Sequence, residues 1–207
     1  MNLYRIFFKR FLDLVISGVA LILLSPVFLV IAILVRTKLG SPIFFSQSRP
    51  GKNEKIFKMY KFRSMIDDTD ENGNLLPDDK RLPAFGKKLR STSLDELPEL
   101  WNIFKGDMSL IGPRPLLIRY LPFYTNYEKR RHNVRPGLSG LSQVSGRNNL
   151  GWDERLSLDV KYVENISLMN DISIIMRTIQ KVIMREDIAS GEELILKDLD
   201  DERKGNN

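Results

Sequence analysis

One run of apolar residues constrains the fold of this chain more than any other feature. Between residues 11 and 35 the sequence reads FLDLVISGVALILLSPVFLVIAILV, and its one charged side chain is Asp13. A helix needs about 20 apolar residues to cross the hydrocarbon core of a bilayer, so this run is long enough. It is also too long for a cleaved signal peptide. The sequence therefore predicts a membrane-embedded helical segment within residues 1–38.

Ser25 and Pro26 interrupt the apolar run near its middle. Proline removes a backbone donor and clashes with the preceding turn, so the helix should bend or break there. Basic residues flank both ends of the run, namely Arg5, Lys9 and Arg10 before it and Arg36 and Lys38 after it. Because positive residues mark the cytoplasmic side of a membrane, the two flanks favour a re-entrant hairpin with both ends in the cytoplasm. A proline-kinked helix that crosses once is the alternative.

Composition and charge exclude several classes of function. The chain has no cysteine and one histidine, which excludes disulfide frameworks, thiolate metal sites and clustered-histidine zinc sites. Residues 1–65 carry 11 basic and 2 acidic side chains, and residues 81–147 carry 12 and 5, within a net charge of +6. Such positive blocks suit an anionic partner. Nucleic acid is the weaker candidate, because the sequence shows no helix-turn-helix, RNA-binding sheet signature or continuous basic helix.

Local patterns predict the elements that follow the apolar segment. Ser93-x-x-Glu96 is a capping-box pattern that places a helix start at Ser93. The expected elements are two short strands within 41–65 joined by a turn at Arg49-Pro50-Gly51, an acidic loop at 67–80, a helix from Ser93 to Phe104, a loop at 109–115, and helices over about 116–131 and 152–164.

A second amphipathic segment begins at Asp171. Apolar residues recur there at helical spacing, with basic residues on another face. The apolar positions are Ile172, Ile175, Met176, Ile179, Val182 and Ile183. Such a helix can lie on an anionic bilayer surface, but a core-packing helix with a solvated basic face has the same pattern and is the commoner case.

Adjacent carboxylates at Asp95 and Glu96 are the strongest single indication of chemistry. An exposed aspartate is ionised at neutral pH and can attack phosphorus to form an aspartyl phosphate. In the alternative interpretation, Glu96 closes a capping box and Asp95 complements the helix dipole.

Cationic residues beside glycine and proline favour a chemical role of the carboxylate pair over a capping role, with a phosphate-rich ligand. Arginine binds phosphate oxygens bidentately, and a metal such as Mg²⁺ would let carboxylates share the same ligand. The candidate cations are Arg114 in IGPRP, Arg135 in VRPG and Arg147 in SGRNN, with Lys61, Arg63 and Arg90 upstream. His132, Trp101 and Trp152 are interpreted as structural, with His132 on a wet basic surface.

Three segments resemble the bacterial sugar transferase family, the monotopic phosphoglycosyl transferases. They are KFRSM (61–65), RSTSLDELPELWNIFKGDMSLIGPRP (90–115) and RPGLSGLSQVSGRN (135–148). The resemblance runs from the apolar segment to about Arg185 and is strongest for the small members that transfer N,N′-diacetylbacillosamine 1-phosphate. The sequence departs from many relatives at Leu141-Ser142 and at Ser145, which leaves the identity of the sugar open.

The resemblance implies an activity and its partners. Members of the family transfer a sugar 1-phosphate from a UDP-sugar to undecaprenyl phosphate, release UMP and act at the cytoplasmic face of the bacterial inner membrane. The expected donor is a UDP-N-acetylated amino sugar, and the reaction would be the first membrane step of glycoconjugate assembly. Membrane lipids surround such an enzyme, and downstream glycosyltransferases are candidate partners. A membrane-anchored scaffold that binds nucleotide-sugars or anionic lipid without turnover is the alternative.

The same resemblance assigns roles to individual residues. Asp95 would be the nucleophile that carries a phosphosugar intermediate, and Glu96 would assist with Mg²⁺. The residues implied around the phosphates are Lys61, Arg90, Arg114 and Arg147, with Asp171 as a further functional acid.

We therefore expect an α/β, helix-rich monotopic membrane protein. Its parts would be a re-entrant membrane helix at 1–38, a compact cytoplasmic catalytic domain at 39–185 with interfacial amphipathic helices, and an acidic, partly ordered tail at 186–207.

Overall fold

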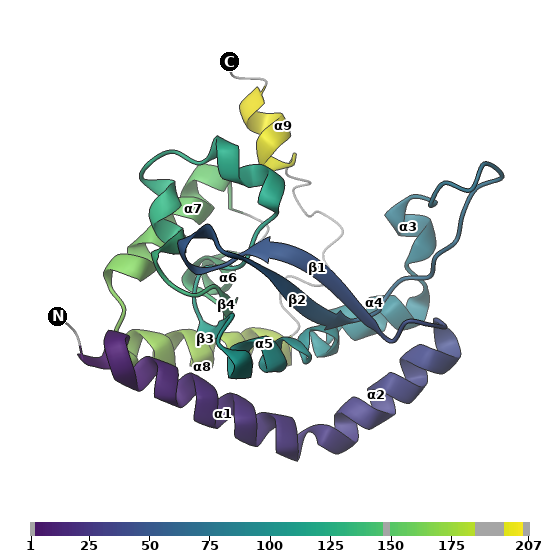
Figure 1. The fold of residues 1–207 in the computed structure, drawn as a ribbon, viewed down its shortest axis with the longest axis horizontal. Coiled ribbons are helices and arrows are strands. Elements are labelled where there is room, and N and C mark those ends of the chain that lie inside the picture. The colour runs from purple at the N-terminus through teal and green to yellow at the C-terminus, as the bar shows by residue number, and fades with distance from the viewer. Residues whose placement is uncertain (1–2, 147–149, 185–196, 205–207) are drawn as a thin grey trace.

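The computed structural model describes residues 3–146, 150–184 and 197–204. Within them helices surround two small two-stranded sheets, one antiparallel and one parallel (Figure 1). The mixed, helix-rich character predicted from the sequence is confirmed. Residues 185–196 and 205–207, most of the expected tail, lie outside the described residues.

The N-terminal segment forms two helices joined at a bend. A π-helical turn at Tyr4–Phe8 leads into α1 at Lys9–Leu23, and α2 follows at Ser25–Lys38. The two axes are bent by 62° at the break, with the proline in the first turn of α2. The break expected at Ser25 and Pro26 is thus confirmed. Among the described residues no single helix meets the length and hydropathy expected of a membrane span, whereas this bent pair meets them together.

An antiparallel hairpin follows these helices. Strand β1 at Phe44–Pro50 pairs with β2 at Ile56–Phe62, in a register that sets Phe44 opposite Phe62. The chain reverses through a short 3-10 turn at Lys52–Glu54. Both predicted strands are confirmed, but the turn predicted at Arg49-Pro50-Gly51 is wrong, because Arg49 and Pro50 belong to β1 and the reversal lies further along the chain. The expected loop at 67–80 is interrupted by a bridge between Thr69 and Leu75 and ends in the short helix α3 at Asp78–Arg81.

The segment that carries the carboxylate pair differs from its prediction. Helix α4 covers Ala84–Ser91, a 3-10 turn covers Leu94–Glu96, and α5 covers Glu99–Lys105. Ser93 has a φ of 54°, in the left-handed region, and its side chain makes no capping hydrogen bond. The predicted capping box is therefore wrong. Pro98 is the N-cap of α5, because its ring is tolerated at a helix start and not further in.

Two segments that were predicted to be one loop and one helix each contain more than one element. The expected loop at 109–115 begins with strand β3 at Ser109–Ile111, which runs parallel to β4 at Gly137–Ser139. The expected helix over 116–131 is wrong: the chain forms 3-10 helices at Ile118–Phe123 and Glu128–Asn133. Pro122 inside the first of them cannot donate to an α-helical ladder.

The remaining helices complete the fold. After the short α6 at Leu141–Ser145, α7 covers Trp152–Glu164 as predicted, α8 covers Leu168–Met184 and α9 covers Leu199–Lys204. Ile174 on α8 is buried, but Ile172, Met176 and Ile183 from the predicted apolar face are exposed. Core packing, the commoner interpretation of this stripe, is thus wrong for most of it.

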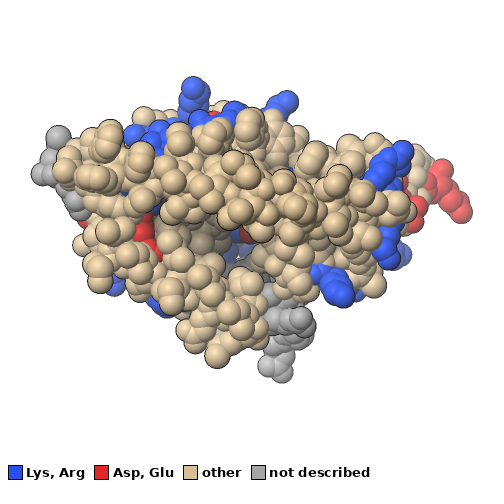
Figure 2. Space-filling view, turned by 90° about the horizontal axis from the view of Figure 1, so that it is seen from below, with Lys and Arg blue, Asp and Glu red and all other residues tan. Residues whose placement is uncertain are grey.

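The exposed apolar side chains of α1, α2 and α8 share one face. In Figure 1 α1 and α2 form the lower edge and α8 lies just above α1, and the view from below is dominated by uncharged residues, with basic side chains near the edges (Figure 2). The most exposed positions include Ile22 at 74%, Leu23 at 71% and Ile183 at 75%. The opposite side of α1 and α2 packs into the core.

Candidate active site

The carboxylate pair lies on the 3-10 turn between α4 and α5. The residue Asp95 is 8% exposed and the side chain of Glu96 is 15% exposed, so the expectation of an exposed aspartate is wrong. Burial, and secondarily the neighbouring Glu96, raises the pKa of Asp95 above its ordinary value. Desolvation disfavours the charged form of a carboxyl group, so cations nearby become important for its ionisation.

Two cations hold Glu96 from separate elements. Lys61 at the end of β2 donates from Nζ to Glu96 Oε1 at 2.6 Å, and Arg114 donates from Nη2 to the same oxygen at 2.7 Å. Burial alone would raise the pKa of Glu96, but Arg114 and Lys61 outweigh it and hold that pKa well below the ordinary value. Glu96 is therefore an ionised, fixed carboxylate.

Asp95 faces a cavity of about 670 Å³ with several polar walls. Arg90 on α4 and Ser64 after β2 line it, and Arg90 Nε donates to Ser64 Oγ at 2.9 Å. Helix α4 can approach this closely because Gly86 has no side chain: a Cβ there would lie 1.9 Å from the carbonyl oxygen of Ser64. A second wall comes from β1 and β2, which contribute Arg49 and Lys61.

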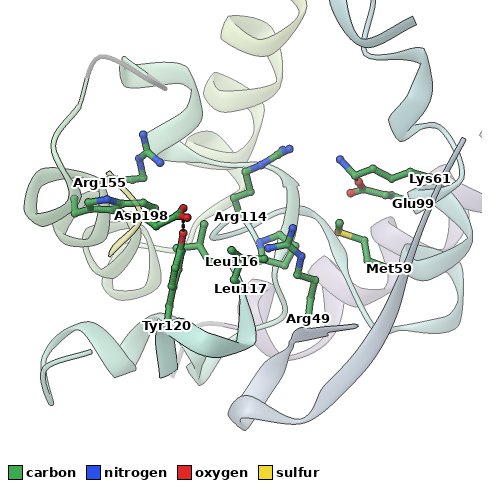
Figure 3. A pocket seen from close by; sticks show the side chains of 12 residues that line it. Arg49, Met59, Lys61, Glu99, Arg114, Leu116, Leu117, Tyr120, Arg155 and Asp198 are labelled. Atoms are coloured by element: carbon green, nitrogen blue, oxygen red, sulfur yellow. Dashed lines mark hydrogen bonds and ion pairs between the residues drawn. The ribbon is translucent and has the colours of Figure 1, made fainter. Parts of the chain in front are cut away.

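Arg114 lines four cavities. The three largest are the cavity of Asp95, a polar cavity of about 370 Å³ and a largely apolar groove of about 340 Å³, and the fourth is about 170 Å³. Figure 3 shows Arg114 near the middle of the polar cavity, between Lys61 and Glu99 on one side and Arg155 and Asp198 on the other. A guanidinium group in this position can contact an anion that enters from any of the three largest.

The structure brings four of the predicted site residues together with the pair. Lys61, Arg63, Arg90 and Arg114 line the cavity of Asp95 and Glu96. Arg63 is largely committed to the fold, because it donates to the carbonyl oxygens of Met65 and Ser41 and pairs with Asp67.

Two other predicted site residues are bonded elsewhere, and a third is not described. Arg135 donates from Nε to the carbonyl oxygen of Gly106 at 2.7 Å, at the end of α5. The carboxylate of Asp171 accepts hydrogen bonds from Tyr4 and Lys9, both at 2.6 Å, and from Tyr162 at 2.7 Å. It therefore ties the N-terminus to α7 and α8. Arg147 lies outside the described residues.

Glu99 is a site residue that the sequence reasoning missed. It is 2% exposed, its Oε1 lies 3.3 Å from Lys61 Nζ, and it lines the polar cavity. Burial and the charge of Glu96 raise the pKa of Glu99 to about 7. The sequence did contain a signal for it: Glu99 follows Glu96 by three residues, and residues three apart on a helical turn lie on the same face.

The three residues interpreted as structural have different surroundings. Trp152 is buried and donates from Nε1 to the carbonyl oxygen of Lys197, whereas Trp101 is 48% exposed and stacks on Phe104. His132 is buried, not on a wet surface. Burial and the nearby Arg131 lower its pKa to about 4.

The donor atoms around Asp95 fit a hard divalent cation. Mg²⁺ prefers oxygen ligands and is commonly held by one or two carboxylates together with substrate phosphates. Asp95 and Glu96 supply two such carboxylates in one cavity. Elsewhere in the described part of the chain, Asp198, Asp200 and Asp201 offer carboxylate oxygens within 4.8 Å of one another.

Comparison with known proteins gives a family and several relatives. The sequence model of the family described as bacterial sugar transferase matches residues 4–185. An uncharacterized sugar transferase of Bacillus subtilis, EpsL, is 48% identical over 180 residues, which cover 87% of this chain and 89% of the relative.

Two longer relatives have names that state a substrate. An undecaprenyl-phosphate galactose phosphotransferase of Salmonella typhimurium is 40% identical over 87% of this chain and 41% of its own length. A UDP-N-acetylgalactosamine-undecaprenyl-phosphate N-acetylgalactosaminephosphotransferase of Aeromonas hydrophila is 38% identical over 86% of this chain and 44% of its own length. The chain thus spans about two fifths of these two proteins.

Proposed function

The chain belongs to the bacterial sugar transferase family, and from that membership we propose that it transfers a sugar 1-phosphate from a UDP-sugar to undecaprenyl phosphate and releases UMP. The observation that carries this proposal is a buried carboxylate pair with two cations on one member and the other facing a cavity lined with arginines. The names of the relatives from Salmonella and Aeromonas support the same carrier lipid.

Asp95 is the proposed nucleophile, because Glu96 is already engaged by two cations through one oxygen. An oxygen of Asp95 attacks the β-phosphorus of the donor, and the bond from that phosphorus to the bridging oxygen breaks. UMP leaves with the bonding electrons, and the sugar phosphate stays on Asp95 as an acyl phosphate. Arg90 and Arg114 are placed to neutralise charge that develops on the phosphate oxygens.

The proposal includes Mg²⁺, held by Glu96 and Asp95 together with the donor phosphates. When bound, the ion neutralises phosphate charge and helps the leaving group depart. Lys61 and Arg114 fix the Glu96 carboxylate, so that its orientation is set before the donor arrives.

The apolar groove is the proposed site for the lipid acceptor. Leu97 and Leu100 line it on one side and Val182 on another, while Glu96 and Arg114 stand at its polar end. An isoprenoid tail fits the apolar wall and its phosphate fits Arg114. An oxygen of that phosphate then attacks the phosphorus on Asp95, the acyl phosphate bond breaks, and the free carboxylate is regenerated.

We further propose that α1 and α2 form a re-entrant hairpin at the cytoplasmic face of the bacterial inner membrane. The bend of 62° and the exposed apolar face seen in Figure 2 support this placement. Exposed apolar residues of α8 extend the same face, and a helix of this kind lies in the interfacial plane. Both ends of the hairpin would then be cytoplasmic, on the side that holds soluble UDP-sugars.

The decisive experiment measures UMP release from a panel of UDP-sugars before any lipid acceptor is added. A two-step mechanism gives about one UMP per enzyme without acceptor, and a UDP-sugar with a radioactive β-phosphate labels the protein. The panel includes the expected UDP-N-acetylated amino sugars together with UDP-galactose.

Variants of Asp95 and Glu96 test the role proposed for each residue. Asp95→Asn removes the anionic nucleophile with little change of shape, so UMP release and labelling should both disappear. Glu96→Gln should slow both half-reactions and still allow labelling. If the wild type releases UMP only with polyprenyl phosphate present, or if Asp95→Asn forms product, the covalent mechanism is wrong.

A further inference from the structure

Asp198, in the segment 197–204, forms part of the wall of the polar cavity, although the family match ends at residue 185. Figure 3 shows Asp198 at one end of this cavity, beside Tyr120 and Arg155, and Trp152 also lines the cavity. Lys61 and Glu99 lie at the other end. The cavity therefore combines residues of the family-wide region with a segment beyond it.

The wall is held in place by specific bonds. Trp152 donates from Nε1 to the carbonyl oxygen of Lys197 at 2.9 Å, and Leu199 is fully buried against the neighbouring helices. Arg203 donates from Nη1 and Nη2 to the two carboxylate oxygens of Glu128, at 2.7 and 2.6 Å. These contacts fix the position of Asp198.

Asp198 and Glu99 are the two carboxylates among residues that line this cavity, which also holds four cationic side chains. The carboxylate of Asp198 accepts a hydrogen bond from the Tyr120 hydroxyl at 2.5 Å and pairs with Arg119, yet its side chain is still 47% exposed. A carboxylate repels phosphate but accepts hydrogen bonds from hydroxyl groups. Tyr120 and Trp152, packed edge to face beside it, are buried and form an apolar support behind the carboxylate. This end of the cavity suits a neutral ring that bears hydroxyl groups.

The sugar of the donor fits this end better than the nucleotide does. The named relatives transfer different sugars, galactose and N-acetylgalactosamine, and share the same carrier lipid. Residues 197–204 lie outside the region that matches the family model, and the sugar is the part of the donor that differs between these relatives. A contact from this segment to the sugar would therefore account for such a difference. We propose that Asp198, positioned by residues 197–204, accepts hydrogen bonds from hydroxyl groups of the donor sugar and so determines which sugar is transferred. This inference rests on the proposed function.

The test compares Asp198→Asn with Asp201→Asn in the full chain. Asp201 has the same side chain on the same segment, is exposed, and does not line the cavity. The assay measures KM and kcat for UMP release with UDP-galactose, UDP-glucose and their N-acetylated amino counterparts, and the inhibition constant of UMP. Asp198→Glu is the second variant, because it keeps the charge and moves the carboxylate by one methylene group.

Asp198→Asn should raise the KM of the preferred donor on the order of tenfold, since bonds to a charged acceptor are lost. The inhibition constant of UMP should change less than about twofold, as expected if the nucleotide contacts are untouched. Asp198→Glu should change the ranking of the donors, and Asp201→Asn should behave as the wild type.

Two results overturn the inference alone. The first is that both Asp198 variants leave the KM and the ranking of the donors unchanged. The second is that the inhibition constant of UMP rises as much as the KM of the donor, which would mean that Asp198 contacts the nucleotide. A wild type that releases no UMP from any donor overturns the proposed function itself. The melting temperature of each variant identifies a loss of activity that is due to unfolding.

Discussion

At the scale of single residues, Asp95 and Glu96 show how neighbours of one chemical type acquire different properties. Burial raises the pKa of Asp95, whereas Arg114 and Lys61 hold the pKa of Glu96 down. A fixed, ionised Glu96 and a cavity-facing Asp95 therefore suit different tasks. Sequence adjacency identifies the pair, but the division between its members depends on cations that come from β2 and from the loop after β3.

His132 provides a prediction about pH. Its pKa is lowered to about 4 from an ordinary value near 6.5, because burial and Arg131 disfavour the charged form. Between these values the unfolded chain takes up a proton that the folded chain does not, so stability falls as pH falls. The full difference corresponds to about 3 kcal/mol of unfolding free energy.

The measurement is urea unfolding of His132→Asn and of the wild type at pH 7 and pH 4. The variant lacks the titrating group, so its loss of stability between the two pH values should be smaller by about 3 kcal/mol. Carboxylates titrate in both proteins, so their contribution to the loss of stability cancels when the two losses are compared. Equal losses would mean that His132 titrates normally in the fold.

At the scale of elements, predictions succeeded where a local pattern was sufficient. The alternation around Arg49-Pro50-Gly51 gave both strands of the hairpin, and the bounds of α7 were predicted from helical spacing. They failed where backbone conformation or proline overrode the pattern. Ser93 adopts a left-handed φ, and Pro122 divides a segment whose apolar spacing suggested one helix.

The sequence predicted part of the candidate site, as it predicted part of the fold. Motif residues gave Lys61, Arg90 and Arg114 beside the carboxylate pair. Asp198 could not be placed there from the sequence, because its approach to Tyr120 depends on tertiary packing of a segment 78 residues further along the chain. Asp171 appeared as an isolated acid in the sequence, and its ties to Tyr4 and Lys9 arise only in the fold.

The bend between α1 and α2 leads to a prediction about topology. Pro26→Leu restores a backbone donor and relieves the clash with the preceding turn, so it should favour one straight helix. A straight helix of this length would cross the bilayer and place its two ends on opposite sides.

The chain has no cysteine, so single cysteines introduced at Asn2 and at the exposed Ser41 can report each end. In the wild-type background both should be protected from an impermeant thiol reagent applied outside the cell. With Pro26→Leu, one of them should become labelled. Labelling of Asn2 in the wild-type background would refute the re-entrant arrangement.

At the scale of the whole molecule, the bent helix pair α1–α2 packs into core clusters that it shares with the rest of the chain. Ile31 and Val35 of α2 are buried with Phe62 and Leu89, and Leu24 packs on the cluster that contains Ile103. Polar contacts reinforce this packing. Asp13 Oδ1 accepts a hydrogen bond from the Leu110 backbone N–H at 2.9 Å, and Arg10 donates to the carbonyl oxygen of Ile103 at 2.7 Å.

This shared core predicts that a chain reduced to residues 39–207 will not fold, even in detergent. Burial of each large apolar side chain contributes roughly 1.5–3 kcal/mol, and the deletion removes several from two clusters at once. It also leaves the Leu110 N–H without its carboxylate partner, at a cost of about 1–3 kcal/mol. These losses together are comparable with the ordinary stability margin of about 5–15 kcal/mol.

The matched control is the double variant Ile22→Ser, Leu23→Ser, which changes side chains of the same helix that are 74% and 71% exposed. It should keep a cooperative thermal transition in detergent and bind vesicles more weakly, because those side chains face outward at the bend. The truncated chain should elute as aggregate and show no cooperative transition. A monomeric, cooperatively melting 39–207 would show that the catalytic part folds alone, and α1 and α2 would then serve as an anchor without a structural role.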